Sequence, residues 1–454
     1  MNKKFLFALP LLAGASWAGA AYYTGTQTQG AYDQMLAQFN RIDRFTLVNE
    51  IYSAGLLNSS AVTRVMDSAE PDASVLFRLR HAINHSPIAV DEGNVRMNVA
   101  TIETTLLREG SLPESVSELM MNFSQAEPFQ INTSVGFDGT TSNEISVSSY
   151  EQQIDGVAVR FKGLDYTAII DGDSIVGSGR IGELVIHSDA GTVRLMPGDM
   201  TTDLRRSSEF AYTGSYGIEF DKLTFTSADN MLLDMALQSI GFQSDTQIAN
   251  ELLQSQARFW IGNIDTLLPL NSVSVDTRVF NIPVSGLSQY VDAIRQLSRP
   301  VDQHSPDTAV IDAAVAANSP IIGPGTGLNY TMKLSNDGGD ATLAYEMSVI
   351  DRSAANYPAG GLASLSTLRD LLNVVQLEAH LDADAVAVDM TPLAMLMSTP
   401  EALQVVIADG ASYRVDLNLA DLILTINGNP LSLEELIGDS IDTPLVDVIG
   451  LQRL

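Results

Sequence analysis

The sequence predicts an α+β fold in which a large, curved antiparallel β-sheet dominates and helices lie across part of one face. Three observations support this prediction. Apolar and polar residues alternate with a period of two from residue 75 onward, tight-turn residues separate the alternating runs, and helical spacing is concentrated after Leu287. The chain has 454 residues, of which 45% are hydrophobic and 18% are charged. This composition is typical of a folded chain of two or three domains rather than a disordered one.

The N-terminus carries Lys3 and Lys4 directly before an uncharged run, Phe5–Tyr23. As a helix this run reaches about 28 Å, close to the roughly 30 Å hydrocarbon core of a bilayer. It fits either a signal peptide cleaved near Ala20 or an uncleaved anchor. The length of the run and its outer aromatic residues favour the anchor. We therefore expect residues 1–24 to cross a membrane once and the rest of the chain to be exported.

The strand prediction rests on alternating runs bounded by Gly, Asn and Asp. The clearest runs are Val75–His85, Val95–Val99, Phe129–Phe137, Tyr216–Phe220, Val273–Val279, Leu343–Val349 and Val415–Leu419. Turn residues lie between such runs at Asp138-Gly139, Asp171-Gly172, Asn336–Gly339 and Asn427-Gly428. Half-buried antiparallel strands joined by short turns produce this pattern.

Helical spacing marks a second, smaller region. The candidate helices are Leu287–Leu297, Asp307–Ala317, Leu362–Val375, Pro392–Met397 and Glu401–Ala408. Between the first two, Arg299–Pro306 has two prolines and little apolar content, which is typical of a linker. We therefore expect a β-rich domain over residues 25–300 and an α+β domain over residues 301–454.

The charge balance limits the partners. Lys and Arg number 25 against 55 Asp and Glu, a net charge of −30. Nucleic-acid binding and adhesion to anionic lipid both need basic surface, so this balance argues against both. The chain has no cysteine, which excludes disulfides, thiol nucleophiles and a lipidated cysteine.

Two motifs have a chemical and a structural interpretation. Gly177–Gly182 matches the spacing G-x-G-x-x-G, but the β-branched run that follows predicts a strand and not the helix that a dinucleotide site needs. We therefore interpret its glycines as a hairpin turn. His81 and His85 have the spacing of a zinc peptidase, but Ala82 replaces the glutamate. On a strand their rings lie about 13 Å apart, so we expect structural histidines and no metal.

Other motifs also have structural explanations. Gly323–Gly327 lacks the ending of a phosphate loop and precedes an expected strand, Leu328–Leu334, so it is a loop. Asp171–Asp173 is too short for a calcium loop, and the acidic pairs Asp382/Asp384 and Glu434-Glu435 are typical of solvated faces. We therefore expect no catalytic residue, no cofactor and no metal, and we rank a hydrolase without a recognisable motif third among the functions.

Three segments together resemble the YdgA-like family of bacterial inner-membrane-anchored envelope proteins. They are Ala21–Gly25 after the hydrophobic run, Leu79–Ile88 with the His-x-x-x-His spacing, and Tyr413–Leu431 with Asn-Gly-x-Pro. Ser86 stands where glycine is usual in the family, and if that glycine adopts a positive φ the local turn must differ here. The resemblance implies a single-pass bacterial inner-membrane protein with its bulk in the periplasm. It marks His81, His85, Pro87, Asn427, Gly428 and Pro430 as motif positions without a known role.

The C-terminal motif also has an independent interpretation. Val415–Leu419 and Leu422–Ile426 are two alternating runs joined by Ala420-Asp421, which predicts a hairpin. Asn427-Gly428 then turns the chain, and Pro430 is incompatible with a central strand.

Two functions remain open. Adjacent apolar residues such as Ile169-Ile170 and Val185-Ile186 indicate that something covers the second face of the sheet. The leading hypothesis is a non-enzymatic envelope protein that binds a partner or forms a homodimer through its sheets. The alternative is a groove that holds or conducts lipid, as in AsmA-like proteins, by analogy of architecture. Lipid or another envelope protein are thus the further candidate partners.

Overall fold

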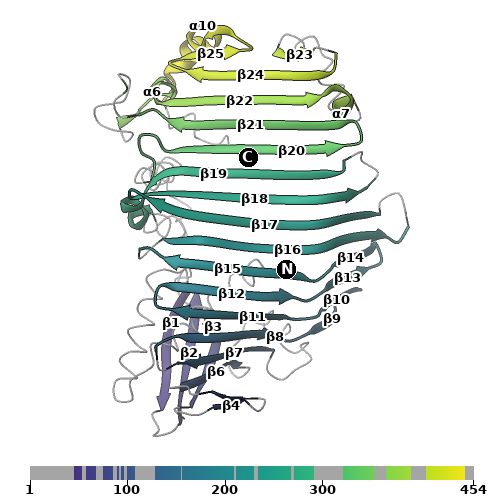
Figure 1. Cartoon of the computed structure of the whole chain (residues 1–454), viewed down its shortest axis with the longest axis vertical. Helices are drawn as coiled ribbons and strands as arrows, with labels where there is room; N and C mark the ends of the chain where they lie inside the picture. Colours follow the sequence, from purple (N-terminus) through teal and green to yellow (C-terminus); the bar gives the residue numbers. More distant parts are fainter. Residues whose placement is uncertain are drawn as a thin grey trace. The chain divides into compact units, whose positions relative to one another are not determined.

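The computed structural model describes residues 45–53, 58–67, 75–84, 89–91, 94–96, 100–107, 128–136, 138–154, 156–208, 211–229, 234–266, 270–290, 321–351, 354, 364–389, 405–408 and 410–444. Every strand pairing in these ranges that is given a register is antiparallel, and the helices are short (Figure 1). The predicted dominance of antiparallel sheet is therefore confirmed. Among the described residues no helix is both long and apolar enough to cross a bilayer. The hydrophobic run over residues 5–23 lies outside them.

The chain divides into two compact units, Met1–Arg206 (unit 1) and Ser207–Leu454 (unit 2). Each unit is described separately below. The domain boundary expected at residues 300 and 301 lies outside the described residues.

Unit 1 is built almost entirely of strands. Its described strands are β1 Phe45–Ser53, β2 Asn58–Asp67, β3 Val75–Asn84, β4 Ala89–Asp91, β5 Asn94–Arg96, β6 Ala100–Leu107, β7 Phe129–Val135, β8 Thr141–Val147, β9 Tyr150–Ile154, β10 Val157–Phe161, β11 Leu164–Asp171, β12 Ser174–Ile181, β13 Leu184–Ser188, β14 Gly191–Leu195 and β15 Gly198–Arg206. The strands β1, β2, β3, β6, β7, β8, β11, β12 and β15 pair in that order. A second series runs β9, β10, β13 and β14.

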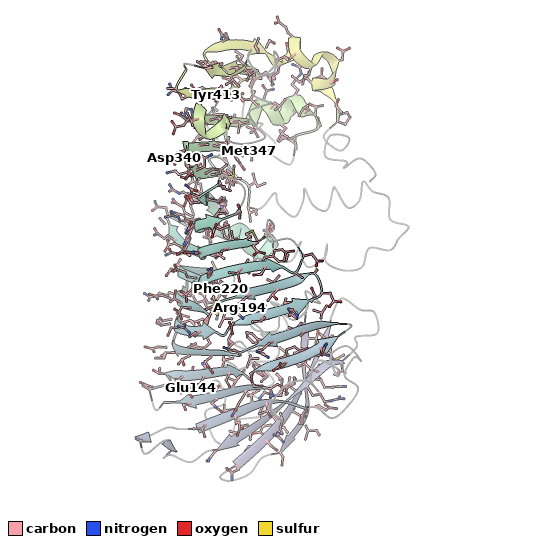
Figure 2. All side chains as sticks on the ribbon, turned by 90° about the vertical axis from the view of Figure 1, so that its right-hand side faces the viewer. Glu144, Arg194, Phe220, Asp340, Met347 and Tyr413 are labelled. Atoms are coloured by element: carbon pink, nitrogen blue, oxygen red, sulfur yellow. The ribbon has the colours of Figure 1, made fainter. Side chains whose placement is uncertain are left out.

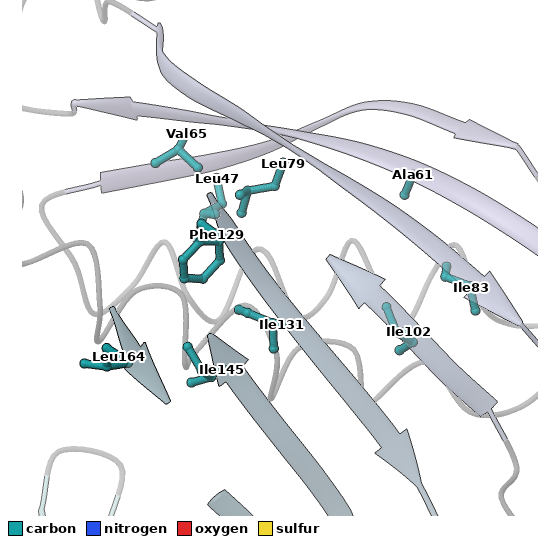
Figure 3. Close-up of a cluster of buried hydrophobic side chains, with 10 residues drawn as sticks. All are labelled: Leu47, Ala61, Val65, Leu79, Ile83, Ile102, Phe129, Ile131, Ile145 and Leu164. Atoms are coloured by element: carbon teal, nitrogen blue, oxygen red, sulfur yellow. The ribbon is translucent and has the colours of Figure 1, made fainter. Parts of the chain in front are cut away.

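One face of the main sheet of unit 1 is a buried core. Its centre includes Leu79, Ile131 and Ile145, and Ile131 is 0% exposed (Figure 3). The burial pattern alternates along β7, where buried positions take every second place. This period-two burial is what the sequence predicts for Phe129–Phe137.

The first two glycines of the motif Gly177–Gly182 lie within a strand, and Gly182 follows its end, so the motif is not a hairpin turn. Gly177 and Gly179 are in the middle of β12, which pairs with β11 and β15 along its whole length. A Cβ on Gly177 would lie 2.2 Å from Oη of Tyr166, and one on Gly179 would lie 2.7 Å from Cδ2 of the same ring. The hairpin interpretation was therefore wrong, because these glycines make room for a cross-strand tyrosine.

Unit 2 continues the same pattern with longer strands. Its described elements are β16 Tyr212–Ser227, β17 Met235–Ala249, β18 Leu252–Asp265, β19 Ser272–Pro283, η3 Val284–Gly286, β20 Gly327–Asn336, β21 Gly339–Val349, α6 Leu368–Val374, β22 Val375–Asp384, α7 Ala385–Asp389, β23 Ile407–Ala408, β24 Ser412–Ala420, β25 Ile423–Ile426, β26 Asn429–Ser432, α10 Leu433–Ile437 and η5 Gly438–Asp442. The strands β16 to β22 pair in chain order, followed by β24, β25 and β26.

The predicted helices have mixed outcomes. Leu362–Val375 contains α6, which begins at a capping box where Thr367 accepts from the N–H of Asp370 and the Asp370 carboxylate accepts in return. Glu401–Ala408 ends in the strand β23, so the helix expected there was wrong at its C-terminal end. The candidates Asp307–Ala317 and Pro392–Met397 lie outside the described residues.

The loop prediction for Gly323–Gly327 is confirmed, because this segment leads directly into β20. The C-terminal hairpin is also confirmed, although its turn lies one residue later than the predicted Ala420-Asp421. β24 and β25 are joined by Asp421 and Leu422, both with positive φ, and β25 and β26 by Asn427 and Gly428, again both positive. Two successive positive φ angles define the turn that matches the twist of a two-residue hairpin.

Candidate functional site

The two faces of the unit 2 sheet differ sharply in chemistry. Residues directly opposite each other on paired strands share a face, so the register assigns each side chain. On β21, for example, Asp340 and Met347 lie on opposite faces, and Figure 2 shows their side chains on the two sides of the ribbon. The charged residues gather on the Asp340 side. The Met347 side is hereafter called the apolar face.

The apolar face consists of four rows that run across β16, β17, β18, β19, β20, β21, β22 and β24. The first apolar row is Phe220, Ile240, Ile261, Val273, Leu334, Ala341, Ala383 and Tyr413. The second apolar row is Ile218, Phe242, Phe259, Val275, Met332, Leu343, Leu381 and Val415. The hydroxyl row is Tyr216, Ser244, Ala257, Thr277, Tyr330, Tyr345, Ala379 and Leu417. The outer row is Gly214, Thr246, Ser255, Val279, Leu328, Met347, Leu377 and Leu419.

None of these positions carries a charged side chain. The rows extend about 34 Å across eight strands and about 20 Å from the first row to the last, a patch of roughly 700 Å². The largest apolar patch on a typical monomer is about 300–600 Å² and is often functional. An uncharged surface of this size, which includes the hydroxyl groups of the third row, is therefore a candidate binding surface.

The apolar face is accessible in this chain. Of its members Ala383 alone is buried, Phe242, Phe259 and Met347 are 36%, 39% and 43% exposed, and the others are half-buried. The core face of unit 1 contrasts with it, because Leu79 is 1% exposed and Ile131 is 0% exposed. The two units therefore use the same strand pattern with opposite results. The apolar surface is a buried core in unit 1 and a half-buried to exposed surface in unit 2.

The opposite face of unit 2 carries a shallow polar hollow of about 450 Å³. It lies across β20, β21, β22, β24 and β25 and contains Glu378, His380, Asp416 and Asn418. These groups bind one another: the ring Nδ1 of His380 lies 2.5 Å from an oxygen of Asp416, and Asn418 donates to Glu378 at 3.2 Å. These four groups are therefore paired, whereas the side-chain oxygen of Asn329, which also lines the hollow, is buried and has no hydrogen-bond partner within the described residues.

The motif histidine His81 lies in the core of unit 1. Its Nε2 is 2.9 Å from the hydroxyl oxygen of Thr63, and its Nδ1 is 2.9 Å from that of Thr104. Burial lowers the pKa of His81 from 6.5 to about 4, so the ring is neutral at neutral pH. Its neighbours are hydroxyls, and within the described residues no group of three or more His, Asp or Glu side chains is placed to hold a metal ion. His85 and Pro87 lie outside the described residues.

The C-terminal motif residues shape a strand junction. Asn427 donates its backbone N–H to the carbonyl of Asp416 and accepts from the N–H of Asp416 through its side-chain oxygen, while its side-chain amide donates to the carbonyl of Val405. It therefore joins the turn after β25 to β24 and to the segment just before β23. Gly428, with a φ of +83°, supplies the second turn position, and Pro430 lies in β26, whose described pairing is with β25. These roles are structural.

Sequence reasoning did not find the apolar face. The signal was present in the alternation, because every second residue of Val273–Val279, Leu343–Val349 and Val415–Leu419 is uncharged. What was missing was the register that aligns those residues into continuous rows.

Together, the fold and this face define a mostly antiparallel β-sheet protein that presents an uncharged, accessible sheet face. The chain belongs to the family described as "Bacterial protein of unknown function (DUF945)", whose model matches residues 1–434. It is also similar to Protein YdgA of Escherichia coli (strain K12), with 24% identity over 294 residues. That similarity covers 58% of this chain and 56% of the relative's length. The resemblance to the YdgA-like family is thereby confirmed. No solved structure matches the chain.

Proposed function

We propose that this protein is a non-enzymatic, inner-membrane-anchored periplasmic protein that binds lipid acyl chains on the apolar face of unit 2. The observation that carries this proposal is the uninterrupted, uncharged and accessible surface over eight paired strands. A lipid groove requires a continuous apolar path, and the rows supply one. Burial of apolar surface is the main driving force for such binding, at about 25 cal/mol for each Å² removed from water.

A second candidate is self-association through the same face, which would make the protein a homodimer. The area favours it, since roughly 700 Å² is close to the about 800 Å² that each partner buries in a standard protein interface. Two sheets packed face to face would place their apolar side chains in one shared core. The net charge of −30 on each copy opposes this association, although salt screens much of the repulsion.

A photo-crosslinking residue at one of two neighbouring positions tests both candidates. Phe259 lies on the apolar face and Arg258, its chain neighbour, lies on the charged face beside Asp276. Full-length protein with p-benzoylphenylalanine at position 259 should form a phospholipid adduct on irradiation in the native membrane, detected by mass spectrometry. The position 258 protein should form none. A chain-to-chain adduct at position 259 without lipid would favour the homodimer. An identical lipid signal at both positions would contradict specific binding.

The membrane topology follows from Lys3 and Lys4 before the hydrophobic run. Alkaline phosphatase fused to the C-terminus should be active, and the mature protein should retain Met1. A mature N-terminus at Ala21 would replace the anchor by a cleaved signal peptide.

A further inference from the structure

The rows of the apolar face differ in chemistry in a way that suits one class of lipid. In the first and second apolar rows every side chain is hydrocarbon or thioether apart from Tyr413, which ends the first row on β24. The hydroxyl row lies directly beside the second apolar row on the same face. A ligand on this surface would therefore contact the two apolar rows and, beside them, the hydroxyl row.

The two apolar rows are long enough and far enough apart to hold a pair of acyl chains, each of which would cover about half the length of a row. The hydrocarbon core of a bilayer is about 30 Å thick and contains two opposed leaflets, so one acyl chain extends about 15 Å. Each row is about 34 Å long, and the two rows are separated by two residues along the strand, or about 7 Å. Two chains fit side by side, one on each row, running across the strands.

The hydroxyl row supplies donors for the polar end of such a lipid. Tyr330 and Tyr345 are cross-strand partners whose rings stack with centroids 5.0 Å apart and an interplanar angle of 20°. Neither tyrosine hydroxyl has a hydrogen-bond partner within the described ranges, whereas Thr246 and Ser255, in the outer row, bond each other at 3.0 Å. A phenolic O–H donates readily to an ester or phosphate oxygen.

The negative charge of the chain disfavours lipids with anionic headgroups. Its net charge is −30, and Glu346 and Glu378 lie on the reverse side of the same strands. A lipid with a net negative headgroup is repelled by this field, while a zwitterionic headgroup is not.

Given lipid binding as proposed above, we infer that the ligand is a zwitterionic diacyl glycerophospholipid. Its two acyl chains lie across the strands in the first and second apolar rows, and its ester or phosphate oxygens accept hydrogen bonds from Tyr330 and Tyr345. The two tyrosines are positioning residues for the polar end of the lipid.

The test is a lipid titration of full-length protein in maltoside micelles, read by native mass spectrometry. The probes are dioleoylphosphatidylethanolamine, anionic dioleoylphosphatidylglycerol and a single-chain lysophosphatidylethanolamine. The wild-type protein should bind the zwitterionic diacyl lipid at least about tenfold more tightly than either of the others, since loss of one chain removes much of the buried apolar area.

Three variants separate this inference from the proposed function. Tyr330→Phe with Tyr345→Phe keeps both rings and should weaken binding about fivefold to tenfold, as expected for two lost hydrogen bonds. Met332→Glu puts a charge in the second apolar row and should abolish binding. Thr331→Glu, its neighbour on the opposite face, is the matched control and should bind as wild type. Hydrogen exchange of β17 and β18 checks that each variant is folded.

Failure of the inferred lipid class and failure of the proposed lipid binding give different results. Unchanged affinity in the double tyrosine variant, or equal affinity for all three lipids, would overturn the inferred headgroup contact and lipid class while Met332→Glu still upheld acyl-chain binding. Equal binding by Met332→Glu and Thr331→Glu, or no lipid bound by the wild-type protein, would overturn the proposed function itself.

Discussion

The buried histidine of unit 1 makes the stability of that unit depend on pH. His81 is enclosed by Thr63 and Thr104, whose hydroxyls bond both ring nitrogens of the neutral form. Because hydroxyls can donate or accept, the neutral ring is satisfied in either tautomer. Protonation adds a charge where the ring has lost its water, and this desolvation lowers the pKa from 6.5 to about 4.

The linkage between protonation of His81 and folding gives the direction and the size of this pH dependence. The unfolded chain takes up the proton near pH 6.5 and the folded chain near pH 4, so stability is constant above about pH 6.5 and falls as the pH drops towards 4. At 1.36 kcal/mol for each pH unit the full loss is about 3 kcal/mol, of which about 2 kcal/mol occurs between pH 7 and pH 5. This corresponds to a change of about 20-fold in the equilibrium constant for unfolding.

Native-state hydrogen exchange of the full-length protein measures this loss locally. Peptides from β2, β3 and β6 report the surroundings of His81, and peptides from β17 and β18 in unit 2 are internal controls. After correction for the intrinsic exchange rate, protection around His81 should fall about 20-fold more between pH 7 and pH 5 in the wild type than in His81→Gln. His187→Gln, at an exposed histidine of unit 1, should keep the wild-type dependence.

One result would refute the proposed role of His81. If wild type and His81→Gln lose protection in parallel between pH 7 and pH 5, the ring of His81 is not held neutral by burial, and carboxylates elsewhere govern the acid sensitivity.

Other predictions concern backbone and packing. Gly179→Ala should destabilise unit 1 by about 1–3 kcal/mol in urea unfolding, because its Cβ would lie 2.5 Å from the backbone oxygen of Asp165; a neutral effect would show that β12 shifts freely. Thr367→Ala removes the N-cap of α6 and should cost about 1 kcal/mol, visible as faster exchange in that helix; unchanged exchange would refute the capping role. Gly241→Ala should displace the indole of Trp260, since the new Cβ would lie 2.0 Å from Cζ2, and should shift the tryptophan emission; an unaltered spectrum would contradict this close approach of the ring to Gly241.

The sequence by itself determined the local structure of many elements. Alternation predicted β7, β19, β21 and β24, because side chains on a strand point to opposite faces with a strict period of two. The pair Asn427-Gly428 predicted a hairpin turn, because both residues tolerate positive φ at little cost. Pro430 predicted an edge position, since proline has no N–H to donate to a second neighbour.

Other features depend on partners distant in the chain. The role of Gly177 and Gly179 could not be read locally, because the reason for the missing Cβ atoms is the ring of Tyr166 on the neighbouring strand. His81 likewise has the spacing of a metal ligand, and only its placement between Thr63 and Thr104 makes it a core residue.

The apolar face of unit 2 is also a feature that depends entirely on partners distant in the chain. Ile131 and Phe259 occupy the same kind of position in the same kind of alternating run, yet one is 0% and the other 39% exposed. A period of two assigns each side chain to a face but carries no information about what packs on that face. The cross-strand register of unit 2 turns single apolar residues of eight strands into continuous rows, and only the tertiary structure decides that these side chains keep solvent contact while the apolar side chains of β3 and β7 in unit 1 form a buried core.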